Sequence, residues 1–126
     1  MKRVLTASIL FFALFAVCTF SRRTVQQIVV VSSQDVFLAQ TFLDEDEKEL
    51  AQDALQQSYQ NWMENRDKLS VLLTHNTLDQ IEEQYLRAQQ YAADQQLEDC
   101  RAEVQELQYN LQQLGESEQF CLANIL

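Results

Sequence analysis

Turn-forming residues are almost absent from this chain of 126 residues. Glycine occurs once, at Gly115, and proline does not occur at all. Because tight turns and hairpins depend largely on these two residues, the chain has little means of building a β-sheet. A long helix, by contrast, meets no residue that would break it. The composition therefore predicts an all-α protein with at most one domain.

Residues that carry most enzymatic and metal chemistry are equally scarce. His75 is the only histidine, and a catalytic base needs a positioned partner. A zinc site needs three or four ligands, and one glycine cannot form a phosphate-binding loop. The acidic run 44–47 lacks the glycine and the ligand spacing of a calcium loop. We therefore predict no enzymatic activity, no metal site and no cofactor.

Positive charge is the third shortage. The formal net charge is −10, and because Lys2 and Arg3 are the only charged residues before residue 22, residues 22–126 carry 19 acidic and 7 basic residues, a net charge of −12. A surface of this sign repels phosphate groups, so nucleic acid is excluded as a partner. An acidic, glutamine-rich surface also keeps a protein soluble.

One long apolar run stands at the N-terminus. Lys2 and Arg3 precede the apolar residues 4–17, and small residues follow between Cys18 and Ser21. This order is typical of a secretory signal peptide. We predict that residues 1–21 are such a peptide, cleaved after Cys18 or, preferably, after Ser21.

An uncleaved membrane anchor is the alternative. The apolar residues 4–20 number 17, which is the lower limit for a membrane-spanning helix. Arg22 and Arg23 on the far side also remove the charge bias that would fix the orientation of an anchor. We therefore expect a secreted, extracellular protein with no stable membrane anchor after signal cleavage.

Residues 22–32 form an N-terminal arm of uncertain structure. The segment 24–31, TVQQIVVV, is β-branched and apolar, which favours a strand. No second convincing strand is present to pair with it, and a lone strand is not stable. The arm either begins a helix or packs in an extended form.

Three helices are predicted after the arm, at 33–43, 44–73 and 78–114. The acidic run suits the first turn of the second helix, Asn76 suits the N-cap of the third, and Gly115 suits a helix C-terminus. Residues 33–115 are therefore expected to form an antiparallel helical hairpin or three-helix bundle with coiled-coil character. Residues 116–126 are expected to form a C-terminal tail.

A seven-residue repeat marks the third helix. Leu97, Val104 and Leu111 recur every seven residues, and each is followed three residues later by another apolar residue, namely Cys100, Leu107 and Leu114. Such heptads predict contact between helices, but they leave open whether the second helix belongs to the same chain. The predicted interaction face consists of Leu97, Val104, Leu107, Leu111 and Leu114.

Two cysteines, Cys100 and Cys121, remain after signal cleavage, and a pair in an oxidising compartment predicts a disulfide. A bond within one chain requires an extended tail that returns along the third helix, because a helical tail would leave the sulfurs too far apart. The alternative is a bond through Cys100 between two copies in a parallel coiled coil.

Aromatic pairs could line a ligand pocket between the helices, namely Trp62 with Tyr59 and Tyr85 with Tyr91. Core packing between the second and third helices is the simpler interpretation. We therefore predict a secreted, non-catalytic helical protein that acts by binding a protein partner or by self-association as a homo-oligomer. The alternative function is an extracellular carrier of a small apolar ligand.

Overall fold

A computed structural model gives the structure, and it describes the backbone of residues 1–125 and the side chains of residues 1–20 and 22–115. The described backbone contains helices and no strand. The helices are α1 (Lys2–Asp44), α2 (Lys48–Glu64), α3 (Arg66–Leu69), α4 (His75–Ala93) and α5 (Leu97–Ile125). The all-α prediction is therefore confirmed.

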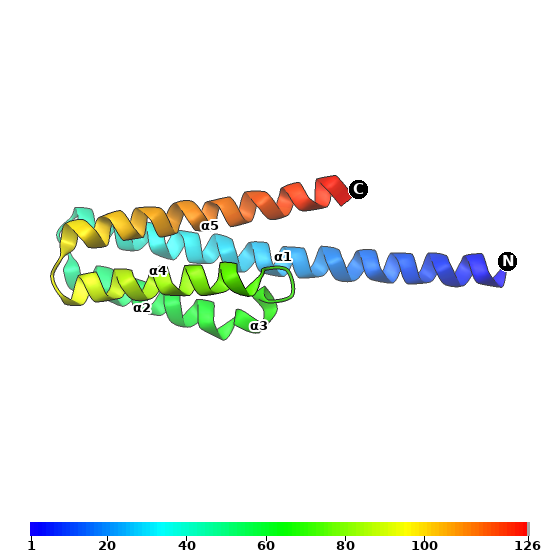
Figure 1. Cartoon of the computed structure of the whole chain (residues 1–126), viewed down its shortest axis with the longest axis horizontal. Helices are drawn as coiled ribbons and strands as arrows, with labels where there is room; N and C mark the ends of the chain where they lie inside the picture. The colour runs from blue at the N-terminus through cyan, green and yellow to red at the C-terminus, as the bar shows by residue number, and fades with distance from the viewer. Residues whose placement is uncertain (126) are drawn as a thin grey trace.

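The four long helices lie side by side, and each runs antiparallel to the one before it (Figure 1). α1 contacts α2 and α5, and α4 contacts α5 and α2. The helices thus enclose one common core, and the short α3 lies against α1 and α2. The N-terminal half of α1 projects beyond this bundle, at the end where α3 lies (Figure 1).

α1 is one uninterrupted helix of 43 residues, and its C-terminal half belongs to the bundle. Its buried residues alternate in steps of four and three: Val25, Val29, Ser32, Val36, Ala39 and Leu43. This is a heptad pattern, and it faces the other helices. Of the two forms considered for residues 22–32, the structure shows the helix and not the extended arm, because burial of this stripe outweighs the strand preference of its valines.

Two turns of the bundle are built on residues with left-handed backbone. Asp46 has φ 59° between α1 and α2, and Gln95 has φ 61° between α4 and α5. After Asp46, the amide of Glu47 donates to the carbonyl of Phe42 at 2.8 Å, and after Gln95 the amide of Gln96 donates to Tyr91 at 2.9 Å. These six-to-one bonds are those of a Schellman motif, in which glycine is the usual left-handed residue.

These turns change two predicted helix boundaries. The acidic run 44–47 is not the first turn of a helix, since Asp44 ends α1, residues 45–47 form the turn and α2 begins at Lys48. The predicted helix 78–114 is divided into α4 and α5 at residues 94–96. Neither turn contains glycine or proline, the residues by which a turn is usually recognised in a sequence.

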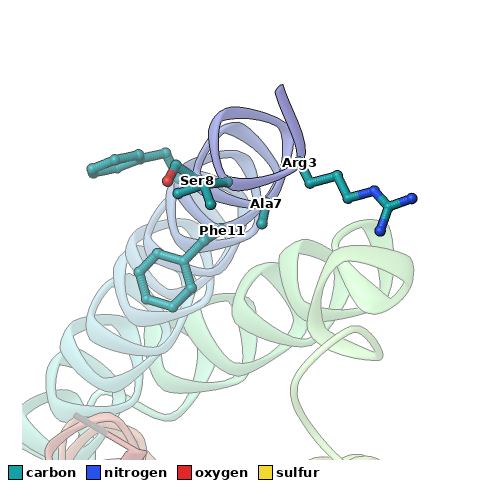
Figure 2. A pocket seen from close by; sticks show the side chains of 6 residues that line it. Arg3, Ala7, Ser8 and Phe11 are labelled. Atoms are coloured by element: carbon teal, nitrogen blue, oxygen red, sulfur yellow. The ribbon is translucent and has the colours of Figure 1, made fainter. Parts of the chain in front are cut away.

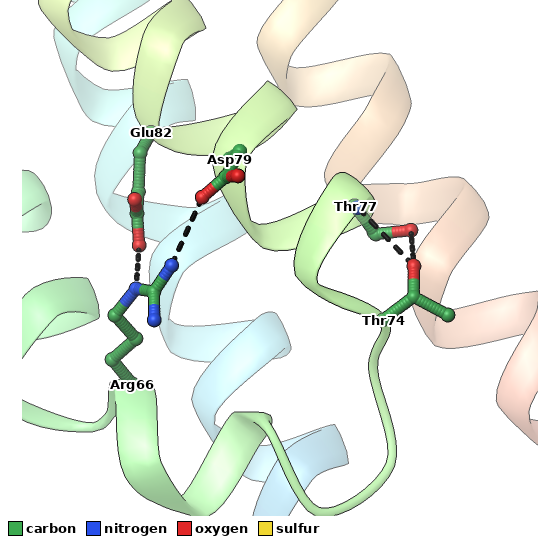
Figure 3. Close-up of polar contacts among 5 residues, drawn as sticks. All are labelled: Arg66, Thr74, Thr77, Asp79 and Glu82. Carbon is green, nitrogen blue, oxygen red and sulfur yellow. Dashed lines mark hydrogen bonds and ion pairs between the residues drawn. The ribbon is translucent and has the colours of Figure 1, made fainter.

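The predicted helix 44–73 also ends early, since α2 stops at Glu64 and α3 covers only Arg66–Leu69. α4 then begins after Thr74 and not after Asn76. The Thr74 hydroxyl oxygen accepts a hydrogen bond from the amide of Thr77 at 3.2 Å (Figure 3). Thr74 is therefore the N-cap.

α5 continues through Gly115 to Ile125. Gly115 does not have the positive φ of a helix C-cap. A Cβ at this position would lie 3.8 Å from the Val29 Cγ1 of α1, an ordinary contact distance. The predicted tail 116–126 thus extends α5 in its backbone as far as Ile125, while its side chains lie outside those described.

Candidate functional site

The predicted interaction face of α5 lies inside the bundle. Cys100, Val104, Leu107 and Leu111 are all 0% exposed, and Leu97 and Leu114 are partly buried against the same core. α5 contacts α1 and α4, so the chain's own helices satisfy the heptads. Of the two alternatives that the heptads left open, the structure shows contact with helices of the same chain.

The reactive group on that face is also enclosed. The Cys100 thiol donates a hydrogen bond to the carbonyl oxygen of Ala88 at 3.4 Å, and it is not part of a disulfide. Burial, with a smaller effect from the carboxylate of Glu103, raises the pKa of Cys100 to about 11. The thiol is therefore protonated and unreactive at neutral pH.

The proposed disulfide partner, Cys121, lies outside the described side chains. Its position falls within α5, which runs to Ile125. Over the 21 residues from Cys100, a helix rises about 31 Å, whereas a disulfide joins Cα atoms only about 6 Å apart. The extended tail that an intrachain bond requires is thus not the conformation of α5.

A polar cluster crosses the bundle core. The hydroxyls of Ser58 in α2 and Tyr85 in α4 are 2.7 Å apart, and Ser32 of α1 and Gln84 of α4 are buried as well. Loss of hydration in the core is the main effect that raises the pKa of Tyr85 to about 12. The Tyr85 hydroxyl is therefore neutral at physiological pH, and its hydrogen bond to Ser58 joins α2 to α4.

Two aromatic side chains of α2, Tyr59 and Trp62, pack against the ring of Tyr85. The ring centroid of Tyr85 lies 5.9 Å from that of Tyr59 and 6.3 Å from that of Trp62. Trp62 and Tyr85 are fully buried. The aromatic side chains of α2 and α4 thus pack on each other as core, the simpler of the two sequence interpretations.

Ion pairs connect the helices at the bundle surface. Arg66 of α3 donates from Nε to Glu82 at 2.6 Å and from Nη2 to Asp79 at 2.9 Å, both in α4 (Figure 3). The hydrogen bond to Glu82 is the largest of the effects that raise the pKa of Arg66. Such a two-carboxylate arrangement connects α3 to α4 and orients the loop between them.

Charged groups at the opposite end have the same structural role. Arg101 of α5 donates to the carbonyl oxygen of Leu43 at 2.6 Å and lies 3.8 Å from the carboxylate of Asp44. It therefore caps the C-terminus of α1, where the helix dipole favours a cation.

The lone histidine and the acidic residues do not converge on a common site. His75 is exposed at the first position of α4. Among the described residues, no group of three or more histidine, cysteine, aspartate and glutamate side chains could hold a metal ion.

The first exposed apolar surface is the N-terminal half of α1. Figure 2 shows Arg3, Ala7, Ser8 and Phe11 on this helix, with side chains that point in different directions. These residues line a hollow of about 410 Å³ on the helix surface. Among the described residues, α1 is the one helix whose length and composition would allow it to cross a membrane. A signal sequence has the same properties.

A second exposed apolar surface, the α1 outer face, lies on the bundle itself. It consists of Val30, Val31, Phe37 and Leu38, which are between 38% and 58% exposed. Their spacing places them on the side of α1 opposite the buried stripe. This face was not predicted because Val30 and Val31 fall in the segment 22–32 of uncertain structure, whereas Phe37 and Leu38 fall in the separate helix predicted at 33–43.

These features define an all-α protein in which the polar contacts described above join one helix to another. Its two exposed apolar surfaces are the N-terminal half of α1 and the α1 outer face. The chain belongs to the family described as Domain of unknown function (DUF4363), whose model matches residues 19–125. The match begins at the end of the apolar segment and includes the whole bundle. No curated protein and no solved structure matches the chain.

Proposed function

We propose that this protein is exported and non-catalytic, and that it acts by self-association through the α1 outer face. The observation that carries the proposal is the exposure of Val30, Val31, Phe37 and Leu38 on one side of a bundle helix. Single exposed apolar side chains are normal in soluble proteins. Here Val30 with Phe37 and Val31 with Leu38 form two apolar rows, one on each side of the exposed Gln34, and a group of this kind on one side of a helix marks an interaction surface.

Charge favours a second copy as the occupant. Residues 22–126 carry a net charge of −12, yet Asp35 is the only charged residue between Thr24 and Leu43. Two copies repel each other when their acidic faces meet. The α1 outer face has no such barrier, and a two-fold axis brings the same residues of both copies together.

Export is supported by the N-terminal segment. Residues 2–20 have the basic start and the apolar run of a signal sequence, and they take no part in the buried core, which begins at Val25. The bundle would therefore keep its first helix whether or not the segment is removed. The compartment we propose is the extracellular side of the membrane.

Sedimentation velocity tests the self-association directly. The protein is measured under reducing conditions, so that no disulfide contributes, in buffer or, if it fractionates with membranes, in mild detergent. We expect Phe37→Glu to weaken dimerisation at least about tenfold, since burial of one large apolar side chain contributes about 1.5–3 kcal/mol.

The matched control is Leu86→Glu, because Leu86 is 50% exposed on α4 and the substitution adds the same charge. It should leave the dimer intact. A wild-type protein that stays monomeric at every concentration, or an equal loss in both variants, would overturn the proposal.

A carrier function remains as the second candidate, and a groove between α1 and α5 favours it. The groove has a volume of about 490 Å³, and its lining includes Val29, Val30 and Leu111 beside Gln112. A fluorescent apolar probe that binds the protein and is displaced by fatty acids would support this function. An absence of displacement would reject it.

A further inference from the structure

The apolar half of α1 has the properties of a lipid-facing helix. Residues 4–20 are exposed almost throughout, and large apolar side chains point in every direction: Val4, Leu5, Ile9, Leu10, Phe11, Phe12, Leu14, Phe15, Val17 and Phe20. At 1.5 Å per residue these 17 residues span about 26 Å, close to the hydrocarbon thickness of a bilayer. A helix that is apolar on all sides is stable in lipid and not in water.

This helix continues directly into the bundle. No glycine or proline lies between Lys2 and Asp44, and the buried stripe starts at Val25, four residues after the expected cleavage site at Ser21. Proteolysis favours flexible, exposed backbone. The segment around Ser21 is instead regular helix.

Apolar residues of the α3–α4 loop lie at the same level as the end of the apolar segment. Phe20 and Thr24 of α1 and Lys68 and Val71 near that loop line one hollow of about 280 Å³. Val71 is 65% exposed, and Phe20 is the last apolar residue of the segment. In a bilayer spanned by residues 4–20, Val71 would therefore lie at the boundary between water and lipid.

The charged residues at the two ends of the bundle favour the same orientation, with the α3–α4 loop facing the bilayer. Four of the seven basic residues after residue 21 lie toward this end of the bundle: Arg22, Arg23, Arg66 and Lys68. The opposite end carries the acidic run 44–47 and, at the start of α5, Glu98 and Asp99. At the first end Arg66 is paired with Asp79 and Glu82, and Glu64 and Asp67 lie beside it in the sequence, so this end is close to neutral. Anionic headgroups therefore meet less repulsion there than at the strongly acidic opposite end.

We propose that residues 4–20 are retained as a membrane anchor and that the α3–α4 loop, through Val71 and Leu72, docks on the same bilayer. The inference rests on the proposed export of the protein, and it replaces the expected cleavage after Ser21. The partner surface is a lipid bilayer with anionic headgroups, and Lys68 lies where it can contact them.

Fractionation and intact mass test the anchor. The full-length chain is expressed in a bacterium, membranes are extracted with alkaline carbonate, and the protein's mass is determined. We expect the chain in the carbonate-resistant fraction with residues 1–21 present. A soluble product that lacks these residues would overturn the anchor, while Phe37→Glu would still test self-association in that product, so the two proposals fail separately.

Fluorescence quenching tests the loop. A polarity-sensitive dye is attached at Val71→Cys in the full chain, with Cys18 and Cys121 replaced by serine, and the protein is reconstituted in phosphatidylcholine–phosphatidylglycerol vesicles. The control site is Leu50→Cys, because Leu50 is an exposed apolar residue at the start of α2, at the far end of the bundle.

Lipids with a nitroxide near the headgroup should quench the dye at position 71 at least twofold more than the dye at position 50. Adding Lys68→Glu should reduce that difference. Equal quenching at both sites would show that the loop stays in water and would overturn its docking.

Discussion

At the scale of single residues, a few buried polar groups make hydrogen bonds between helices inside this bundle. Ser58 and Tyr85 bond at 2.7 Å in a largely apolar core that also contains the buried Ser32 and Gln84. Cys100 bonds to a backbone carbonyl of the neighbouring helix. Buried polar groups cost free energy when they lose a partner, so these contacts select one alignment of the helices over its neighbours.

Replacing Tyr85 with phenylalanine tests this alignment. The change leaves the Ser58 hydroxyl without its partner in the core, and we expect the free energy of unfolding to fall by about 1–2 kcal/mol. Urea denaturation followed by circular dichroism measures it. The double variant with Ser58→Ala should lose less than the two single variants together, and strict additivity would show that the bond contributes nothing.

The Cys100 thiol provides a second test at this scale. Because burial raises its pKa to about 11, we expect maleimide at pH 7 to leave Cys100 unmodified in the native protein and to modify it after unfolding in urea. Peptide mass spectrometry reads the modification. The control is a Leu50→Cys variant, because position 50 is exposed on the bundle, and equal labelling of position 50 and Cys100 under native conditions would contradict the burial.

At the scale of helices, periodicity predicted contacts better than boundaries. The heptads from Leu97 to Leu114 correctly indicated a helix packed on other helices, since packing depends on the repeat itself. The turns at Asp46 and Gln95 could not be found, because residues other than glycine adopt the left-handed conformation there. Gly115 predicted a helix C-terminus that is not there, since α5 continues through it.

The same repeat was present in α1 and was overlooked. Val25, Val29, Val36 and Leu43 follow the steps of a heptad, but the run of valines around them suggested a strand. The α1 outer face was not predicted for the same reason, because the exposed side of a helix can be assigned only when its buried side is known.

Gly115→Ala distinguishes the two accounts of α5. Within a helix, the change from glycine to alanine stabilises by about 0.5–1 kcal/mol, and the new Cβ has room because its nearest neighbour on α1 is 3.8 Å away. We expect thermal unfolding to shift upward. A downward shift would indicate the left-handed helix end that the sequence alone predicted.

At the scale of the whole molecule, negative charge opposes folding. Burial raises the pKa of Asp35 and of Glu103, so the folded state binds protons more tightly than the unfolded chain. Stability from these groups is therefore fully present below their ordinary pKa values and is lost as pH rises through the raised ones. Repulsion within a chain of net charge −10 acts in the same direction.

We therefore expect the midpoint of thermal unfolding to rise as pH is lowered from 7.5 toward the ordinary pKa values of these groups, 3.8 for Asp35 and 4.5 for Glu103. Added salt at pH 7.5 should also raise it, because salt screens the repulsion. Glu103→Gln should flatten the pH dependence, whereas Glu98→Gln, at an exposed position of the same helix, should change it less. A midpoint that falls steadily over this range would contradict the assignment.

The account depends most on α1, which supplies the first helix of the bundle, the α1 outer face and the apolar segment. Hydrogen exchange of the backbone amides tests it most directly. We expect the amides of residues 25–43 to exchange as slowly as those of residues 100–111 and to open with them in one transition. Rapid exchange between residues 24 and 32, with α5 still protected, would show that this segment is an arm and not a helix of the bundle.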